Sequence, residues 1–339
     1  MERFYLNTKG VNMEDLEEIG YSLWCDFIHR DFLHNGFGAL LSYGVNGATS
    51  NPSIFASSLE SQSYKKRIEQ LKQQDSTMSA KEVYENIALS DIKTAAQILT
   101  PLYKKNQDNG YISIEIDPFL CDDAPKSIDE GVRIFQSIDK PNVMIKVPAT
   151  QAGYEVMNAL VAKNIPVNAT LIFSPNQANE CMQAFAQARK GSNSIARGVV
   201  SIFVSRFDRA YNAMQEANDE VKNTLGIANA KKCYSIIQNL DDKFSRALFA
   251  STGVKGDDLP KDYYITSLIL PKSINTAPLD ALQYFLQEQE DKRVQVVDSN
   301  VDKILALVGE ETLGQMYQHL LVDGLNAFKQ SFEEMLRKL

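Results

Sequence analysis

Short apolar runs rich in β-branched and aromatic residues recur along the chain, separated by segments with helical periodicity. Such runs are typical of buried strands, and strands that alternate with helices are typical of a parallel sheet. The pattern predicts eight strands, at Ser22–Phe27, Asn46–Ser50, Tyr111–Asp117, Val143–Val147, Asn168–Phe173, Val199–Val204, Arg246–Ser251 and Tyr264–Leu270. The helical stretches between them include Ala80–Lys104, Gly153–Lys163, Pro175–Arg189 and Arg206–Leu225.

Eight strand–helix units predict an α/β protein with a single (β/α)8 TIM barrel, a fold that needs about 250 residues. The chain has 339 residues, which we expect to form a single domain over 1–339. The surplus predicts extra N- and C-terminal helices: a lead-in over 1–20, a helical excursion near Gln62–Ser79, and helices over about 275–339 that pack on the barrel. The last helix, Leu321–Leu339, has one apolar face for this packing, formed by Leu325, Phe328, Phe332 and Leu336.

Polar side chains occupy the inward positions of four predicted strands. Side chains alternate faces along a strand, so a helix-facing set of Val143, Ile145 and Val147 would direct Met144 and Lys146 inward. By the same alternation the inward set includes Trp24, Asp26, Ser113, Glu115, Asn168 and Thr170, while Ala169, Leu171 and Phe173 face the helices. The polar groups lie toward the carboxyl ends of the strands, where barrel active sites are found.

Lys146 is the costliest of these residues to bury. Burial disfavours the charged form of a lysine, and a neutral amine is a nucleophile. A Schiff-base lysine also needs groups that move protons, and Glu115 and Asp26 are the available carboxylates. The alternative is a structural ion pair between Lys146 and one of them, and the pattern leaves both interpretations open.

The composition of the chain argues against several classes of binding partner. The chain has 43 acidic and 35 basic residues and a formal charge of −8, which argues against a nucleic-acid or anionic-membrane surface. It has no apolar run near the roughly 20 residues of a membrane helix, and its first residues do not resemble a signal peptide. The four cysteines form no Cys-x-x-Cys pair, and the three histidines are too few for a metal cluster. We expect a cytoplasmic protein without nucleic-acid or membrane partners, and a homodimer is compatible with the sequence.

Four segments resemble the motifs of the transaldolase family, and they occur in the family's order. They are residues 47–55 with Thr49-Ser50-Asn51-Pro52, residues 143–150 around Lys146, residues 167–174, and residues 201–206. The resemblance implies a Schiff-base enzyme of the class I aldolase superfamily that acts in the pentose phosphate pathway. Such a transferase moves a dihydroxyacetone unit from sedoheptulose 7-phosphate or fructose 6-phosphate to glyceraldehyde 3-phosphate or erythrose 4-phosphate. It uses no metal or organic cofactor.

Carried over position by position, the resemblance implies a role for each candidate site residue. The implied catalytic set is Lys146 as nucleophile, Asp26 as base for the donor's C4 hydroxyl, Glu115 as proton shuttle and Thr170 as holder of its water. The implied substrate-binding set is Asn51 and Asn168 for the dihydroxyacetone hydroxyls, Ser201 and Phe203 along the site, and Arg206, Ser251 and Lys255 for the phosphate.

The chain departs from the family pattern at the phosphate end. Lys255 closes a Ser-Thr-Gly-Val-Lys stretch where many members have Ser-Phe-Arg, so it is either a second phosphate cation or a solvated loop charge. Ile202 and Ser205 replace a Pro and a Gly that are often seen there.

Two other functions remain open on these residues. A sugar-phosphate aldolase would use the same lysine and differ only in proton access to the enamine. A non-catalytic barrel that binds sugar phosphates would be expected to have lost Lys146, Asp26 or Glu115, and all three are present.

Overall fold

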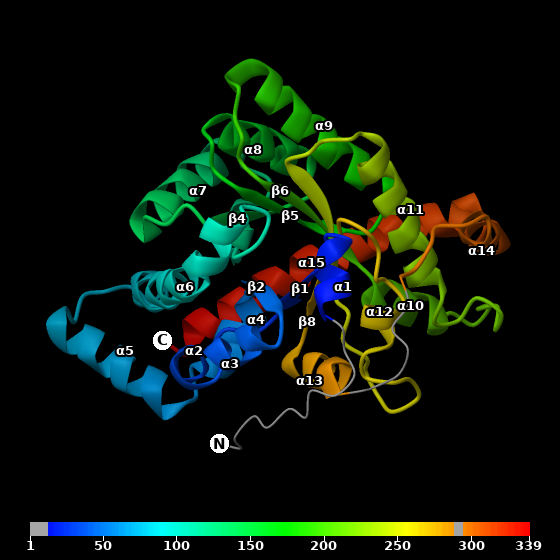
Figure 1. Ribbon diagram of the computed structural model, residues 1–339. Helices are drawn as coiled ribbons and strands as arrows, with labels where there is room; N and C mark the ends of the chain where they lie inside the picture. Colours follow the sequence, from blue (N-terminus) through cyan, green and yellow to red (C-terminus); the bar gives the residue numbers. More distant parts are fainter. Residues whose placement is uncertain (1–12, 288–293) are drawn as a thin grey trace.

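The computed structural model describes residues 13–287 and 294–339, and within them eight parallel strands close into a barrel (Figure 1). Each strand pairs with its neighbours in chain order, and β8 pairs with β1 to complete the ring. The strands are β1 (Ser22–Cys25), β2 (Val45–Thr49), β3 (Ile112–Glu115), β4 (Val143–Pro148), β5 (Val167–Ile172), β6 (Gly198–Phe203), β7 (Ser245–Ala250) and β8 (Ile274–Ala277). The predicted (β/α)8 barrel is confirmed.

Helices surround the barrel and connect its strands (Figure 1). Those on the connections are α2 (Arg30–Asn35), α3 (Phe37–Ser42), α4 (Pro52–Ser58), α6 (Ala80–Lys105), α7 (Ala124–Ile138), α8 (Gln151–Ala162), α9 (Pro175–Ser192), α10 (Ser205–Asn212) and α11 (Leu225–Asn239). The connections also contain α5 (Gln62–Gln74), the 3₁₀ helix η1 (Pro118–Leu120) and α12 (Tyr263–Thr266). α1 (Met13–Glu18) precedes the first strand, and α13 (Leu279–Gln287), α14 (Asn300–Val308) and α15 (Glu310–Arg337) follow the last one. The predicted excursion is α5, whereas residues 1–12 of the predicted lead-in and 288–293 of the predicted C-terminal region lie outside the described residues.

The predicted eighth strand is wrong. Residues 264–270 form most of α12 and the turn after it. The eighth strand of the barrel is β8, at Ile274–Ala277. The C-terminal helices therefore begin at Leu279. The apolar run at Leu268, Ile269 and Leu270 is buried in the core, as the run suggested, but not in a strand. The strand itself reads Ile-Asn-Thr-Ala, which contains no apolar run that a pattern could detect.

The helix predicted over residues 206–225 is two helices. α10 ends at Asn212, and α11 begins at Leu225 after a series of turns. Asn218 starts one of these turns, because its side-chain oxygen accepts a hydrogen bond from the Glu220 N–H at 3.0 Å. Asn223 has a left-handed backbone with φ of 64°, which a continuous helix does not allow.

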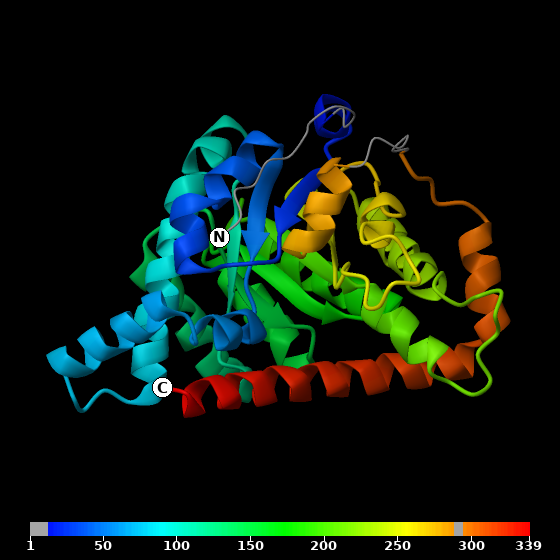
Figure 2. The same ribbon diagram turned by 90° about the horizontal axis from the view of Figure 1, so that it is seen from below.

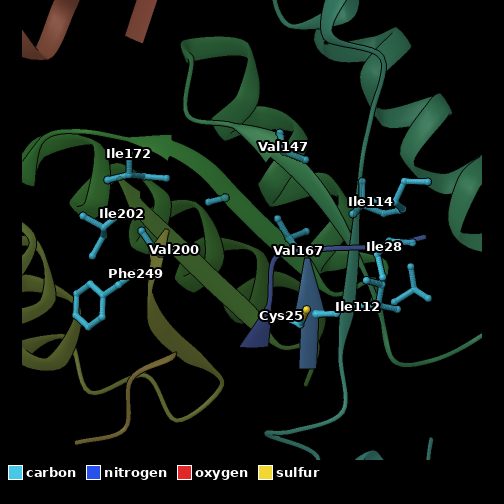
Figure 3. Packing of buried hydrophobic residues seen from close by; sticks show 14 of the residues in the cluster. Cys25, Ile28, Ile112, Ile114, Val147, Val167, Ile172, Val200, Ile202 and Phe249 are labelled. Atoms are coloured by element: carbon cyan, nitrogen blue, oxygen red, sulfur yellow. The ribbon is translucent and has the colours of Figure 1, made fainter. Parts of the chain in front are cut away.

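The strands carry apolar residues on both faces. Figure 3 shows part of the outer cluster, with Ile114 of β3, Val147 of β4 and Ile202 of β6 among its members. A second cluster holds Trp24 and Met144, in agreement with the predicted inward positions. Trp24 needs a glycine opposite it, since a Cβ on Gly47 would lie 2.4 Å from the indole Nε1.

The predicted outward orientation of Leu171 and Phe173 is wrong. Both residues belong to the cluster of Trp24, and Ile172 belongs to the outer one. Leu171 has a φ of 60°, and the register between β5 and β6 shifts between Ala169 and Ile172. A bulge of this kind reverses the alternation of side chains beyond it.

The helix α15 runs as one long rod across an end of the barrel (Figure 2). It contacts α4, α10 and η1, and it begins at Glu310 instead of Leu321. Phe332 is buried in the outer cluster, and Leu325 and Phe328 pack against the cluster of Trp24, so the predicted docking face is confirmed. Among the helices of the described residues, none has the length and apolar character to cross a membrane.

Candidate active site

A cavity of about 260 Å³ opens at the carboxyl ends of the strands, beneath α15. The residues of the predicted site that line it are Asp26, Asn51, Lys146, Ser201, Phe203, Arg206, Ser251 and Lys255. Ala327 and Phe328 of α15 complete one wall. The cavity therefore brings together side chains from both ends of the chain and from the middle.

Lys146 and Glu115 meet at the base of the site. The register places them side by side on β4 and β3, and Lys146 Nζ lies 2.7 Å from Glu115 Oε1. Lys146 also donates a hydrogen bond to the Ser50 carbonyl at 3.0 Å. Both side chains are only 8% exposed. The structure thus contains the ion pair that the sequence left as an alternative, and it places that pair at the base of the cavity.

Burial changes the chemistry of this pair. It raises the pKa of the Glu115 carboxyl, although the neighbouring Lys146 acts in the opposite direction. Transfer of a proton from the ammonium to the carboxylate would replace two buried charges by a neutral pair. The arrangement can therefore supply a neutral amine together with an acid beside it.

Asn168 and Thr170 lie behind the wall of the cavity. Asn168 donates to Ser113 Oγ at 2.9 Å and accepts from Ser201 Oγ at 2.6 Å, so its amide is fixed from β3 and from β6. Thr170 pairs in register with Pro148, and within the described chain its buried hydroxyl has no hydrogen-bond partner. Asn168, Thr170 and Glu115 do not line the cavity, and Glu115 is linked to it by its contact with Lys146, which does.

Asp26 and Asn51 come from the loops that follow β1 and β2. Asp26 Oδ1 accepts a hydrogen bond from Thr49 Oγ1 at 2.6 Å. Asn51 caps α4, because its Oδ1 accepts from the Ile54 N–H at 3.0 Å and Pro52 fills the first helical position. The cap uses the Oδ1 of Asn51, so its side-chain NH₂ can serve as a donor to a molecule in the cavity that Asn51 lines.

Cations gather in the part of the cavity that follows β6 and β7. Arg206 is half-buried with its guanidinium 5.3 Å from the Phe203 ring centre, and burial together with the nearby Arg209 lowers its pKa. Arg209 lies one turn further along α10, is exposed, and donates to Ser205 Oγ at 3.1 Å. The Ser205 hydroxyl lies 3.1 Å from that of Ser251. Lys255 is an exposed residue of the loop after β7, and it also lines this cavity.

Sequence reasoning missed several lining residues, namely Thr49, Ser205, Arg209, Thr276 and Phe328. Arg209 carried a signal, because a residue three positions after Arg206 falls on the same helix face. Thr276 carried none, because the strand that holds it was predicted in the wrong place. Phe328 was predicted only as a packing residue.

Comparisons with known proteins agree with this geometry. A profile of the family described as Transaldolase/Fructose-6-phosphate aldolase matches residues 23–339. A protein of Helicobacter pylori (strain Shi470) named transaldolase is 48% identical over 324 residues, which cover 93% of this chain and 98% of that protein. A protein of Campylobacter jejuni (strain RM1221) with the same name is 44% identical over 331 residues, covering 94% of this chain and 99% of the relative. The chain belongs to the transaldolase/fructose-6-phosphate aldolase family.

Proposed function

We propose that this protein is a transaldolase, a transferase that moves a dihydroxyacetone unit from a ketose phosphate to an aldose phosphate. The observation that carries the proposal is the position of Lys146. Its Nζ lies 2.7 Å from Glu115 at the base of a cavity whose wall also holds Asp26. Fructose 6-phosphate and sedoheptulose 7-phosphate are the proposed donors, and the cytoplasm, where the pentose phosphate pathway operates, is the proposed location.

The first half of the reaction forms the Schiff base. Glu115 takes a proton from the Lys146 ammonium, and the neutral amine adds to the C2 carbonyl of the ketose. The hydroxyl of the carbinolamine then leaves as water when Glu115 returns the proton. The unpartnered Thr170 hydroxyl can hold the water that carries this proton. Loss of water leaves an iminium between Lys146 and C2.

The second half breaks the carbon–carbon bond. Asp26 accepts the proton of the C4 hydroxyl, the C4 carbonyl forms, and the electron pair of the C3–C4 bond moves into the iminium. The shortened aldose phosphate leaves, and a three-carbon enamine stays on Lys146. Attack of this enamine on a second aldose phosphate runs the same steps in reverse.

The cationic end fits the phosphate of the substrate. Arg206 and Lys255 lie on the same cavity as the hydroxyl of Ser251, and a guanidinium can bind phosphate oxygens in a forked geometry. We add Arg209 to this set, since it lines the cavity and is linked to Ser251 through Ser205. Asn51 and Asn168 are proposed to hold the dihydroxyacetone hydroxyls and the enamine, with Ser201 and Phe203 along the site. Asn168 does not line the cavity, but it accepts a hydrogen bond from Ser201, which does.

A two-substrate assay tests the proposal against simple aldol cleavage. With fructose 6-phosphate alone, a transaldolase releases at most one equivalent of glyceraldehyde 3-phosphate per active site, because the enamine waits for an acceptor. Addition of erythrose 4-phosphate should restore turnover and yield sedoheptulose 7-phosphate with ping-pong kinetics. Continuous release of free dihydroxyacetone without an acceptor would instead identify an aldolase.

A further inference from the structure

Three polar side chains form a chain across neighbouring strands at the end of the cavity that holds Asp26. Thr49 Oγ1 lies 2.6 Å from Asp26 Oδ1 and 2.7 Å from Thr276 Oγ1. Closure of the barrel makes this possible, because β1 lies between β2, which carries Thr49, and β8, which carries Thr276. All three residues line the cavity.

The backbone around Thr276 is fixed. Its carbonyl accepts a hydrogen bond from Thr252 Oγ1 at 2.7 Å. The next residue, Ala277, accepts from the Asp26 N–H at 2.8 Å. The strand β8 therefore holds the backbone of Asp26 directly and its side chain through Thr49.

The available hydrogens decide which group donates in each of these hydrogen bonds. A carboxylate can only accept, and a threonine hydroxyl has one hydrogen to donate. When Asp26 is ionised, the hydrogen of Thr49 points to Asp26. The short contact with Thr276 is then a hydrogen bond only if the Thr276 hydroxyl donates to the oxygen of Thr49.

Water cannot easily replace the hydroxyl of either threonine. Thr49 is 1% exposed and Thr276 is 3% exposed, so a lost hydroxyl leaves its partner without solvent to bond. Without the donor on Thr276, the hydrogen of Thr49 still has a partner, but the oxygen of Thr49 loses the bond that fixes its orientation.

We infer that Thr276 is a positioning residue for the carbon–carbon bond step. It orients the hydroxyl of Thr49 toward Asp26, and Thr49 in turn holds the carboxylate in the direction from which Asp26 takes the substrate proton. This inference rests on the proposed function. Lys146 and Glu115 are held by other contacts, so Schiff-base formation does not depend on Thr276.

Two substitutions at the same position separate the hydroxyl from the shape of the side chain. Thr276→Val keeps the branched shape and removes the donor, whereas Thr276→Ser keeps the donor and removes a methyl group. Single-turnover reactions with fructose 6-phosphate, quenched with borohydride, measure Schiff-base formation, and release of glyceraldehyde 3-phosphate measures bond cleavage. We expect Thr276→Val to slow cleavage about tenfold, as loss of one buried hydrogen bond would, with Schiff-base formation changed less than about twofold. Thr276→Ser should stay within about threefold of the wild-type cleavage rate.

A double-mutant cycle with Thr49→Val tests whether Thr276 acts through Thr49. If it does, Thr49→Val/Thr276→Val will cleave no more slowly than Thr49→Val alone. Multiplicative losses would overturn the inference, as would equal slowing of both steps or a failure of Thr276→Ser to rescue cleavage. The wild-type reaction distinguishes failure of this inference from failure of the proposed function. If the wild-type protein traps no substrate, the proposed function is refuted. If the wild-type protein traps and cleaves the substrate and Thr276→Val does so equally fast, only the role of Thr276 is refuted.

Discussion

At the residue scale, the site combines a buried acid–base pair with a second carboxylate that is held separately. Lys146 and Glu115 contact each other at the bottom of the cavity, while Asp26 accepts a hydrogen bond from Thr49 on the neighbouring strand. The two parts have no hydrogen bond in common among the described residues, and the charge of Asp26 is only the last of the causes that change the pKa of Glu115. Substitutions should therefore affect the two chemical steps separately.

Asp26→Asn tests this separation. The amide keeps the shape of the carboxylate but cannot accept the proton of the C4 hydroxyl, so we expect cleavage to fall by at least about 100-fold while the Schiff base still forms. Borohydride trapping followed over time measures the first step, and aldose release measures the second. An equal loss in both steps would contradict the assigned role.

Arg209→Gln tests the added phosphate cation. Loss of one guanidinium should raise the KM for erythrose 4-phosphate about tenfold and leave the KM for unphosphorylated erythrose unchanged, since only the former carries the anion. Arg337→Gln is the matched control, because Arg337 is exposed on α15 and pairs with Glu333 away from the cavity. Equal effects of Arg209→Gln on both acceptors would remove Arg209 from the phosphate set.

At the element scale, helix ends and helix faces place the site. α10 carries Arg206 and Arg209 toward the cavity, and its Asp208 faces the other way, where it accepts a hydrogen bond from the Gly226 N–H at 2.6 Å. This bond joins α10 to the start of α11. α15 covers the cavity with Phe328 and is held in place along its length.

The joint between α10 and α11 should make stability depend on pH. Burial raises the pKa of Asp208 to about 6, against hydrogen bonds and the charge of Arg209 that lower it, while Tyr263 and Tyr264 are the other titratable groups beside it. An unfolded aspartate titrates near pH 4, so the folded state binds this proton more tightly. The stabilisation is complete below that pH and is lost as the pH rises through about 6.

Urea unfolding at pH 5 and pH 7.5 measures this effect, and the fluorescence of Trp24, the single and fully buried tryptophan, reports it. The titration of Asp208 should lower the unfolding free energy of the wild type by about 1 kcal/mol when the pH rises from 5 to 7.5. Asp208→Asn should lack this part of the decrease. Parallel pH dependence in the two proteins would contradict the prediction.

Two glycines of α15 should respond differently to alanine. A Cβ on Gly314 has open space around it, whereas a Cβ on Gly324 would lie 2.9 Å from the buried Leu171. Gly314→Ala should therefore stabilise the protein by about 0.5–1 kcal/mol through helix propensity, and Gly324→Ala should show no such gain. Denaturant midpoints compare the two variants directly, and an equal gain at both positions would show that Leu171 does not restrict α15.

Elements with long apolar runs could be predicted from the sequence, and those without them could not. β4 was predicted at Val143–Val147 and runs over Val143–Pro148, because four of its residues are apolar. β8 has polar residues at its centre, so the pattern favours a more apolar segment that begins ten residues earlier. The reversed side-chain alternation at Leu171 could not be predicted either, because its positive φ occurs at a leucine and not at a glycine or asparagine, the residues that usually indicate one.

At the scale of the whole molecule, closure of the barrel assembles the site. Thr49 and Thr276 are 227 positions apart in the chain and meet only because β8 pairs with β1. The family motifs identified Lys146, Asp26 and Glu115 without this knowledge. The residues that hold Asp26 required the structure, because their contact depends on strand order and register instead of local pattern.

Reduction of the protein with borohydride in the presence of fructose 6-phosphate, followed by peptide mass mapping, is the most direct test of the role of Lys146. We expect a stable sugar-derived adduct on the peptide that contains Lys146, formed only with substrate, and no adduct in Lys146→Ala. An adduct on a different lysine, or no adduct when Trp24 fluorescence or calorimetry shows that fructose 6-phosphate binds, would mean that Lys146 serves only as the partner of Glu115.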